Sequence, residues 1–143
     1  MATQYTPETI ARRQEIFNKV FLHLKNQGAR SVDPACTRIY FPQCLYRNPN
    51  GLKCAIGVLI PDDKYEDRFE YGYYADNPII LQAAGLSGED AEFAVDLQGA
   101  HDGITRNKDF MSQLIENMTS VAKEYQLDPA IMGNQLVKQD QKD

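Results

Sequence analysis

Cysteine and histidine are scarce in this sequence, and tryptophan is absent. Its 143 residues include three cysteines and two histidines. No Cys-x-x-Cys or His-x-x-x-His spacing occurs, so a local zinc motif is missing and we expect neither a metal nor a cofactor. The glycine-rich phosphate loop of nucleotide-hydrolysing enzymes and the Gly-x-Ser-x-Gly elbow of hydrolases are missing too. These three enzyme motifs are therefore excluded, and we assign no catalytic residue.

Long apolar runs and an excess of positive charge are also absent. The N-terminal segment has no apolar stretch of the signal-peptide kind, and no run reaches membrane-spanning length. The formal net charge is -5, which argues against direct binding to nucleic acid or to a membrane surface. We therefore expect a soluble cytoplasmic protein.

The hydrophobic content, in contrast, is ordinary at 43%. It is enough for one globular core at this length. We predict a single domain over residues 1–137 and a disordered polar tail over residues 138–143. The expected fold class is α+β: a mainly helical domain in which a small antiparallel β-hairpin packs on three or four helices.

The first helix has clear boundary signals. Thr6 is its predicted N-cap, Pro7 occupies the first helical position, and Gly28 ends it. The polar side chains Arg12 and Arg13 are expected on its solvated face.

Three further helices are indicated by caps and apolar spacing. A short one opens at Pro78, a second spans about residues 88–102, and a third runs from about residue 107 to 125, before Pro129. For Gly57 to Ile60, strand and short buried helix remain open.

The strongest local signal is the turn at residues 48–51, Asn-Pro-Asn-Gly. Proline presets the first central position and glycine can take the left-handed conformation, so the turn predicts a β-hairpin. Counting outward pairs Arg47 with Lys53. Strand alternation then places Cys44 and Cys54 on the buried face.

Two cations side by side need an anion nearby. One of the chain's own carboxylates can supply it, or the two side chains can diverge into water. The alternative is an anionic ligand, since the fork of Arg47 beside the ring of Tyr46 suits recognition of a phosphate or a base. Lys53 would add a second positive charge.

His101 and Asp102 precede Gly103 at the predicted end of a helix. An imidazole there can complete the helix terminus. Alternatively, the pair can contact a ligand or act as a general base and its neighbour. The candidate ligand-binding residues are therefore Tyr46, Arg47, Lys53, His101 and Asp102.

The segment from Tyr65 to Tyr74, called here the tyrosine-rich segment, carries five aromatic residues among charged ones. Such a segment can cover the core and leave its hydroxyls in water. It can also form a partner surface, because tyrosine is enriched at interfaces.

Several short motifs resemble a group of small uncharacterised proteins of tailed bacteriophages and prophages. The pattern is Cys-x-Tyr-Arg, Gly-x-x-Cys-Ala-x-Gly, Ile-Pro-Asp and Leu-Gln-x-x-His-Asp. The matching residues are Cys44, Tyr46, Arg47, Gly51, Cys54, Ala55, Gly57, Ile60, Pro61, Asp62, Leu97, Gln98, His101 and Asp102. The resemblance covers roughly residues 10 to 127 and departs in a tyrosine-rich insertion around Tyr71 to Tyr74. It implies a viral accessory protein in the host cytoplasm.

Three functions remain open. The first is a non-enzymatic binding protein that sequesters an anionic, nucleotide-like small molecule or inhibits a host defence protein. The second is a small hydrolase or transferase in which a cysteine and His101 cooperate. It requires Cys44 or Cys54 to be exposed beside His101, whereas alternation places both on the buried face. The third is a structural or assembly role in the virion, with homo-oligomerisation through the tyrosine-rich segment. We favour binding.

Overall fold

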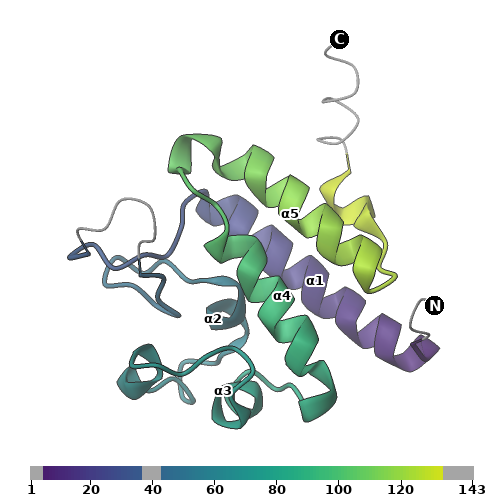
Figure 1. Ribbon diagram of the computed structural model, residues 1–143, viewed down its shortest axis with the longest axis horizontal. Coiled ribbons are helices and arrows are strands. Elements are labelled where there is room, and N and C mark those ends of the chain that lie inside the picture. The colour runs from purple at the N-terminus through teal and green to yellow at the C-terminus, as the bar shows by residue number, and fades with distance from the viewer. Residues whose placement is uncertain (1–4, 37–42, 134–143) are drawn as a thin grey trace.

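The computed structural model describes residues 5–36 and 43–133, and the tail predicted at residues 138–143 lies outside this range. Over the described residues the fold consists of helices joined by loops (Figure 1). The α-helices are α1 (Pro7–Gln27), α2 (Ala55–Leu59), α3 (Pro78–Ala83), α4 (Ala91–Asp102) and α5 (Phe110–Glu124). Single 3-10 turns are η1 (Asp67–Glu70), η2 (Gly88–Asp90), η3 (Asn107–Asp109) and η4 (Pro129–Met132).

Helix α1 begins after Thr6 and ends before Gly28, as the two cap residues indicated in the sequence. The Thr6 hydroxyl accepts a hydrogen bond from the Thr9 amide, and Pro7 occupies the first turn. Gly28 ends the helix with φ of 71°, a left-handed conformation that glycine adopts without steric cost.

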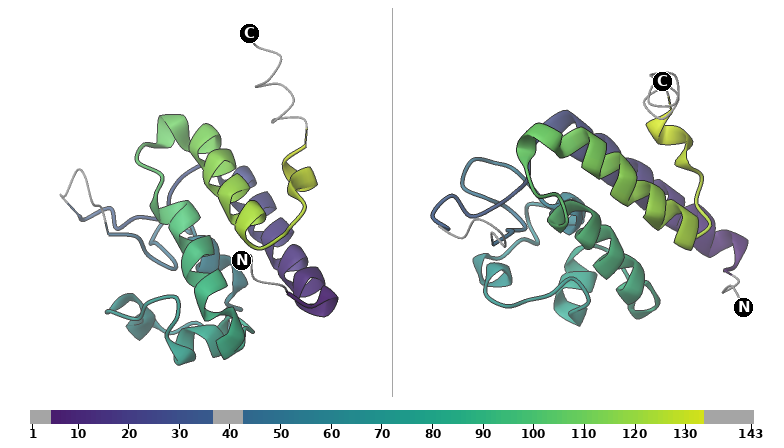
Figure 2. Two further views of the ribbon diagram at one scale, coloured as in Figure 1. Left: turned by 45° about the vertical axis from the view of Figure 1, so that its right-hand side comes forward. Right: turned by 45° about the horizontal axis from the view of Figure 1, so that its top comes forward.

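Helices α1, α4 and α5 supply a large share of the buried core. Helices α1 and α5 lie side by side and antiparallel, and α4 packs against α5 (Figures 1 and 2). The short helix α2 contacts both α1 and α4. Fully buried side chains of this core include Phe17, Phe21, Phe93, Leu97, Phe110 and Leu114. The loops of residues 28–36, 43–54 and 60–77 gather on the far side of α2 and α4 from α5.

The predicted β-hairpin is wrong, and with it the α+β class. No strand occurs among the residues described, where the fold is mainly helical. The turn itself forms: the Asn48 amide donates to the Leu52 carbonyl at 2.9 Å, and Arg47 pairs with Lys53 as an isolated antiparallel bridge. Pairing stops there, and Cys44 instead forms a bridge with Val32.

Helix α2 is what ends the pairing. The Cys54 sulfur accepts a hydrogen bond from the Gly57 amide at 3.3 Å, so Cys54 caps a helix where the hairpin required a strand. A Cβ atom at Gly57 would lie 2.0 Å from the Tyr46 carbonyl oxygen. Glycine thus lets α2 press directly onto the backbone of Tyr46, in the space that a second strand would need.

Within the described residues, no helix combines the length and the apolar character that crossing a membrane requires.

Candidate functional site

A pocket of about 550 Å³ opens where three segments distant in sequence meet. Cys44 and Tyr46 come from the loop before the turn. From the tyrosine-rich segment and the residue after it come Phe69, Glu70, Gly72, Tyr73, Tyr74 and Ala75. Gln98 and Asp102 come from the C-terminal half of α4. Arg30 also lines the pocket. Four of these lining residues, Cys44, Tyr46, Gln98 and Asp102, belong to the motifs singled out in the sequence.

Arg30 brings a positive charge to this pocket. Its Nε donates to the Asn107 side-chain oxygen at 3.2 Å, and its Nη1 donates to the Ile104 carbonyl at 3.2 Å. These two hydrogen bonds hold the guanidinium at the pocket. They engage only part of its fork, which has five N–H donors.

Glu70 connects the tyrosine-rich segment to the turn. One carboxylate oxygen accepts from the Tyr46 amide at 2.9 Å. The other accepts from the Arg47 amide at 3.0 Å and from the Tyr65 hydroxyl at 2.6 Å. With three donors bound, this carboxylate is already committed to the protein, although it lines the pocket.

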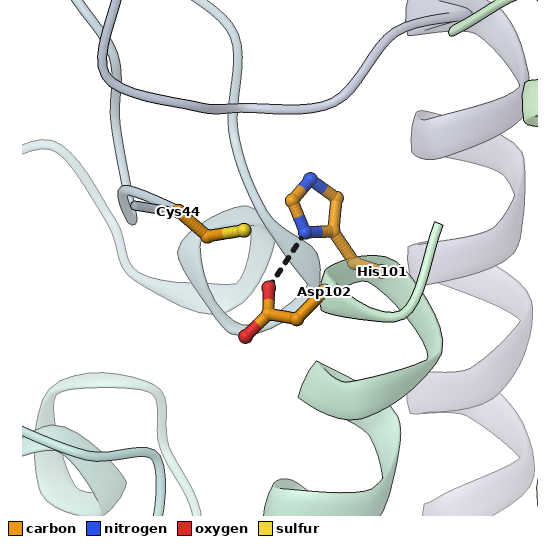
Figure 3. Close-up of side chains that lie close together, drawn as sticks. All are labelled: Cys44, His101 and Asp102. Atoms are coloured by element: carbon orange, nitrogen blue, oxygen red, sulfur yellow. Dashed lines mark hydrogen bonds and ion pairs between the residues drawn. The ribbon is translucent and has the colours of Figure 1, made fainter. Parts of the chain in front are cut away.

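His101 and Asp102 form an oriented pair at the end of α4 (Figure 3). The His101 ring is fully buried, and its Nε2 lies 2.9 Å from the Ser31 amide. Because a backbone amide can only donate, Nε2 must be the acceptor, which places the ring proton on Nδ1. Nδ1 therefore donates to the Asp102 carboxylate at 2.8 Å. Both nitrogens of this histidine are engaged with the protein.

Cys44 is not in the interior, which corrects the prediction. Its side chain is half-buried and lines the pocket, with the sulfur turned toward His101 and Asp102 (Figure 3). Burial, reinforced by the charge of Asp102, raises the pKa of the Cys44 thiol to about 12. The group is therefore a neutral thiol at neutral pH. Cys54, in contrast, is fully buried as predicted.

Arg47 and Lys53 lie beside each other but away from this pocket. Arg47 Nη2 forms an ion pair with Asp62 at 2.8 Å and donates to the Ile60 carbonyl at 2.8 Å. Its guanidinium stacks 4.6 Å from the centre of the Tyr65 ring. The anion beside Arg47 is thus a carboxylate of the chain itself, that of Asp62. Lys53 is not among the residues that line the pocket.

Tyr46 and the tyrosine-rich segment form the aromatic side of the pocket. Tyr46 is buried, and its hydroxyl donates a hydrogen bond to the Tyr73 carbonyl. The rings of Phe69 and Tyr73 are in contact, with their centres 5.9 Å apart. Tyr74 lines the pocket yet is 76% exposed, whereas Tyr71 is 79% exposed and outside it. The segment therefore covers the core and also presents open aromatic faces.

The structure thus assembles part of the predicted site and adds to it. Tyr46 and Asp102 line the pocket, and His101 stands directly behind Asp102. Sequence reasoning missed Arg30 and Glu70. Neither belongs to a motif, and only the folded chain brings them to the pocket.

Comparison of this chain with protein-family models, with curated proteins and with solved structures finds no match.

Proposed function

We propose that this protein acts by binding, and that the pocket captures a small anionic ligand of the nucleotide class. The observation that carries the proposal is the pocket itself, whose volume of about 550 Å³ falls in the range of small-molecule sites. The proposal keeps Tyr46 and Asp102 as ligand-site residues. It replaces Arg47 and Lys53 by Arg30 as the source of positive charge.

The chemistry of the pocket matches both ends of a nucleotide. Tyr74 offers an open ring on which a base can stack, as aromatic side chains do in proteins that bind single bases. Arg30 offers guanidinium donors to a phosphate. Asp102, whose side chain is 40% exposed, can accept hydrogen bonds from the amino or imino groups of a base.

The same contacts argue against the hydrolase or transferase alternative. Cys44 does lie beside His101, as that alternative requires. A nucleophilic cysteine, however, needs a base with a free nitrogen pointing at the sulfur. Both nitrogens of His101 are occupied by Ser31 and Asp102. The neutral thiol therefore has no partner to activate it, and its neighbour Asp102 opposes its ionisation.

A nucleotide panel tests the proposal. Isothermal titration calorimetry with mononucleotides, in the presence of a chelator to remove metal ions, should detect binding of at least one of them. Changing Tyr74 to alanine should weaken that binding by about 1–3 kcal/mol, the worth of one stacked base. Arg30→Gln should cost about 1.5–3 kcal/mol through the lost charged hydrogen bond.

Two matched controls separate the pocket from the rest of the surface. Tyr71→Ala removes an equally exposed tyrosine outside the pocket, and Lys53→Gln removes a cation outside it. Both should bind nucleotide like the unaltered protein. Failure of every nucleotide in the panel to bind, or equal losses in a variant and its control, would refute the proposal.

A further inference from the structure

Three side chains of different ligand type converge at the inner end of the pocket. The Cys44 sulfur, one ring nitrogen of His101 and one carboxylate oxygen of Asp102 all lie within 4.8 Å of one another. Figure 3 shows the sulfur and the carboxylate facing the same space beside the imidazole. We propose that these three residues bind a divalent transition-metal ion of the zinc class.

The donor set is the basis for naming that class. Thiolate sulfur, imidazole nitrogen and carboxylate oxygen are the ligands that zinc uses in proteins, whereas magnesium and calcium take oxygen alone. Zinc bond lengths in a tetrahedral site set neighbouring ligand atoms roughly 3.3–3.8 Å apart. Atoms now within 4.8 Å need to approach by at most about 1.5 Å to reach this spacing, and the His101 and Asp102 atoms, now 2.8 Å apart, need to separate by about 0.5–1 Å.

Two of the three residues also leave room for a further ligand. Cys44 and Asp102 line the pocket, whereas His101 is buried behind them. A metal held by these residues therefore has three protein ligands and a remaining position that faces the pocket. Sites with three protein ligands and one open position are the kind at which zinc binds water or a small molecule.

Metal binding requires a defined rearrangement of protons. In the metal-free protein the Cys44 thiol carries its proton, as an unligated thiol ordinarily does at neutral pH, and the contact of Nε2 with the Ser31 amide places the His101 ring proton on Nδ1, which donates to Asp102. The metal takes the sulfur and Nδ1, so one proton leaves to solvent and the ring proton moves to Nε2. The thiolate and carboxylate charges then balance the two positive charges of the metal.

This rearrangement changes the hydrogen bond between Ser31 and His101. The Ser31 amide now donates to Nε2 at 2.9 Å, and a proton on Nε2 removes that acceptor. The loss of an outer-shell hydrogen bond weakens metal affinity by roughly 10- to 100-fold. We therefore expect an affinity lower than that of four-ligand structural zinc sites. The chemical shift of the Ser31 amide should therefore change when a metal binds. If the three residues had only a structural role, adding metal would leave this chemical shift unchanged.

A cobalt titration tests the site, because Co²⁺ reports sulfur ligation in its spectrum. Adding Co²⁺ to the reduced full chain should give one equivalent of binding, with a thiolate-to-metal charge-transfer band in the near ultraviolet. Cys44→Ser should remove this band. Asp102→Asn, which can keep the hydrogen bond from His101, should weaken binding more than roughly 10-fold, the smallest loss known for outer-shell changes.

The control is the other thiol of the same region. Cys54→Ser keeps an oxygen that can cap α2 and lies outside the proposed ligand set, so it should bind Co²⁺ like the unaltered protein. In a nitrogen-proton correlation spectrum, Zn²⁺ should shift the Ser31 amide and transfer the His101 ring proton from Nδ1 to Nε2.

Absence of stoichiometric Co²⁺ binding would overturn the proposal, as would a charge-transfer band that persists in Cys44→Ser. So would a His101 ring that keeps its proton on Nδ1 at saturating Zn²⁺. The readouts use the metal alone, so they remain decisive whether or not a nucleotide binds the pocket.

Discussion

Changing Arg13 to methionine should destabilise the fold by about 3 kcal/mol. The Arg13 residue is only 4% exposed, although it belongs to helix α1. Its Nε forms an ion pair with Asp90 at 2.9 Å, and its Nη2 donates to the Glu89 carbonyl at 3.0 Å. Asp90 itself is 1% exposed. Removing the arginine leaves a buried carboxylate with half of its partners.

Aromatic rings surround the same guanidinium. The rings of Tyr5, Phe93 and Tyr125 have their centres 4.9, 5.3 and 5.5 Å from its central carbon. Methionine preserves most of the apolar contact with these rings, so the variant measures mainly the loss of charge and hydrogen bonds. Breaking a buried pair costs about 3–5 kcal/mol, and the lower end applies because Arg12 still contacts Asp90 at 3.0 Å.

The assay is thermal and urea unfolding followed by far-ultraviolet circular dichroism, because the fold is mainly helical and the chain has no tryptophan. For a chain of 143 residues, a loss of about 3 kcal/mol corresponds to roughly 10 °C in Tm. Arg12→Met is the matched control. The Arg12 side chain is 37% exposed and pairs with the exposed Glu89 as well as with Asp90, which keeps its closer partner Arg13 in this variant. Its loss should therefore cost only about 1 kcal/mol. Equal effects of the two substitutions would refute the assignment of Arg13 as a buried structural charge.

Two further predictions concern packing and pH. Gly57→Ala should destabilise the protein by about 3 kcal/mol or more, because the new Cβ overlaps the Tyr46 carbonyl, whereas Gly99→Ala in an open part of α4 should raise stability by up to about 1 kcal/mol. Urea unfolding checks both, and a mild Gly57→Ala variant would contradict the close approach. Burial, and then the hydrogen bond to Asp96, raise the pKa of Tyr125, so the folded state holds this proton more tightly than the unfolded state. The unfolding free energy should therefore fall as pH rises above about 10, and less steeply in Tyr125→Phe; an unchanged slope would show that Tyr125 does not contribute.

Local signals in the sequence were sufficient for the longer helices. Thr6 and Gly28 act within one turn of the helix that they bound, so the limits of α1 can be read from neighbouring residues alone. Arg13 shows that local signals do not predict contacts between residues distant in sequence. Nothing near it in sequence indicates that Asp90 will meet it, so the sequence predicted a solvated side chain and the structure buries it.

The hairpin failed because two local preferences competed. The Asn-Pro-Asn-Gly turn was correct, and so was the pairing of Arg47 with Lys53. A short apolar run after Cys54 fits either a strand or a buried helix, and periodicity does not separate them. Capping by the Cys54 sulfur and the close contact of Gly57 with Tyr46 favour the helix over the strand.

The candidate site was predictable only in the parts that motifs mark. Tyr46 and Asp102 were identified because each belongs to a short recognisable pattern, and both line the pocket. Arg30 and Glu70 were missed because their roles arise from contacts between distant segments. The error over Cys44 followed directly from the hairpin, since strand alternation had assigned its side chain to the interior.

The hydrogen bonds of Glu70 have a consequence for local opening of the backbone near Tyr46. One carboxylate receives the amides of Tyr46 and Arg47 and the hydroxyl of Tyr65. These three hydrogen bonds attach residues 65–70 to the backbone of Tyr46 and Arg47 without using the α1–α4–α5 core. Loss of the Glu70 carboxylate should expose the Tyr46 and Arg47 amides together, and native-state hydrogen exchange should then show faster and correlated exchange at these two amides.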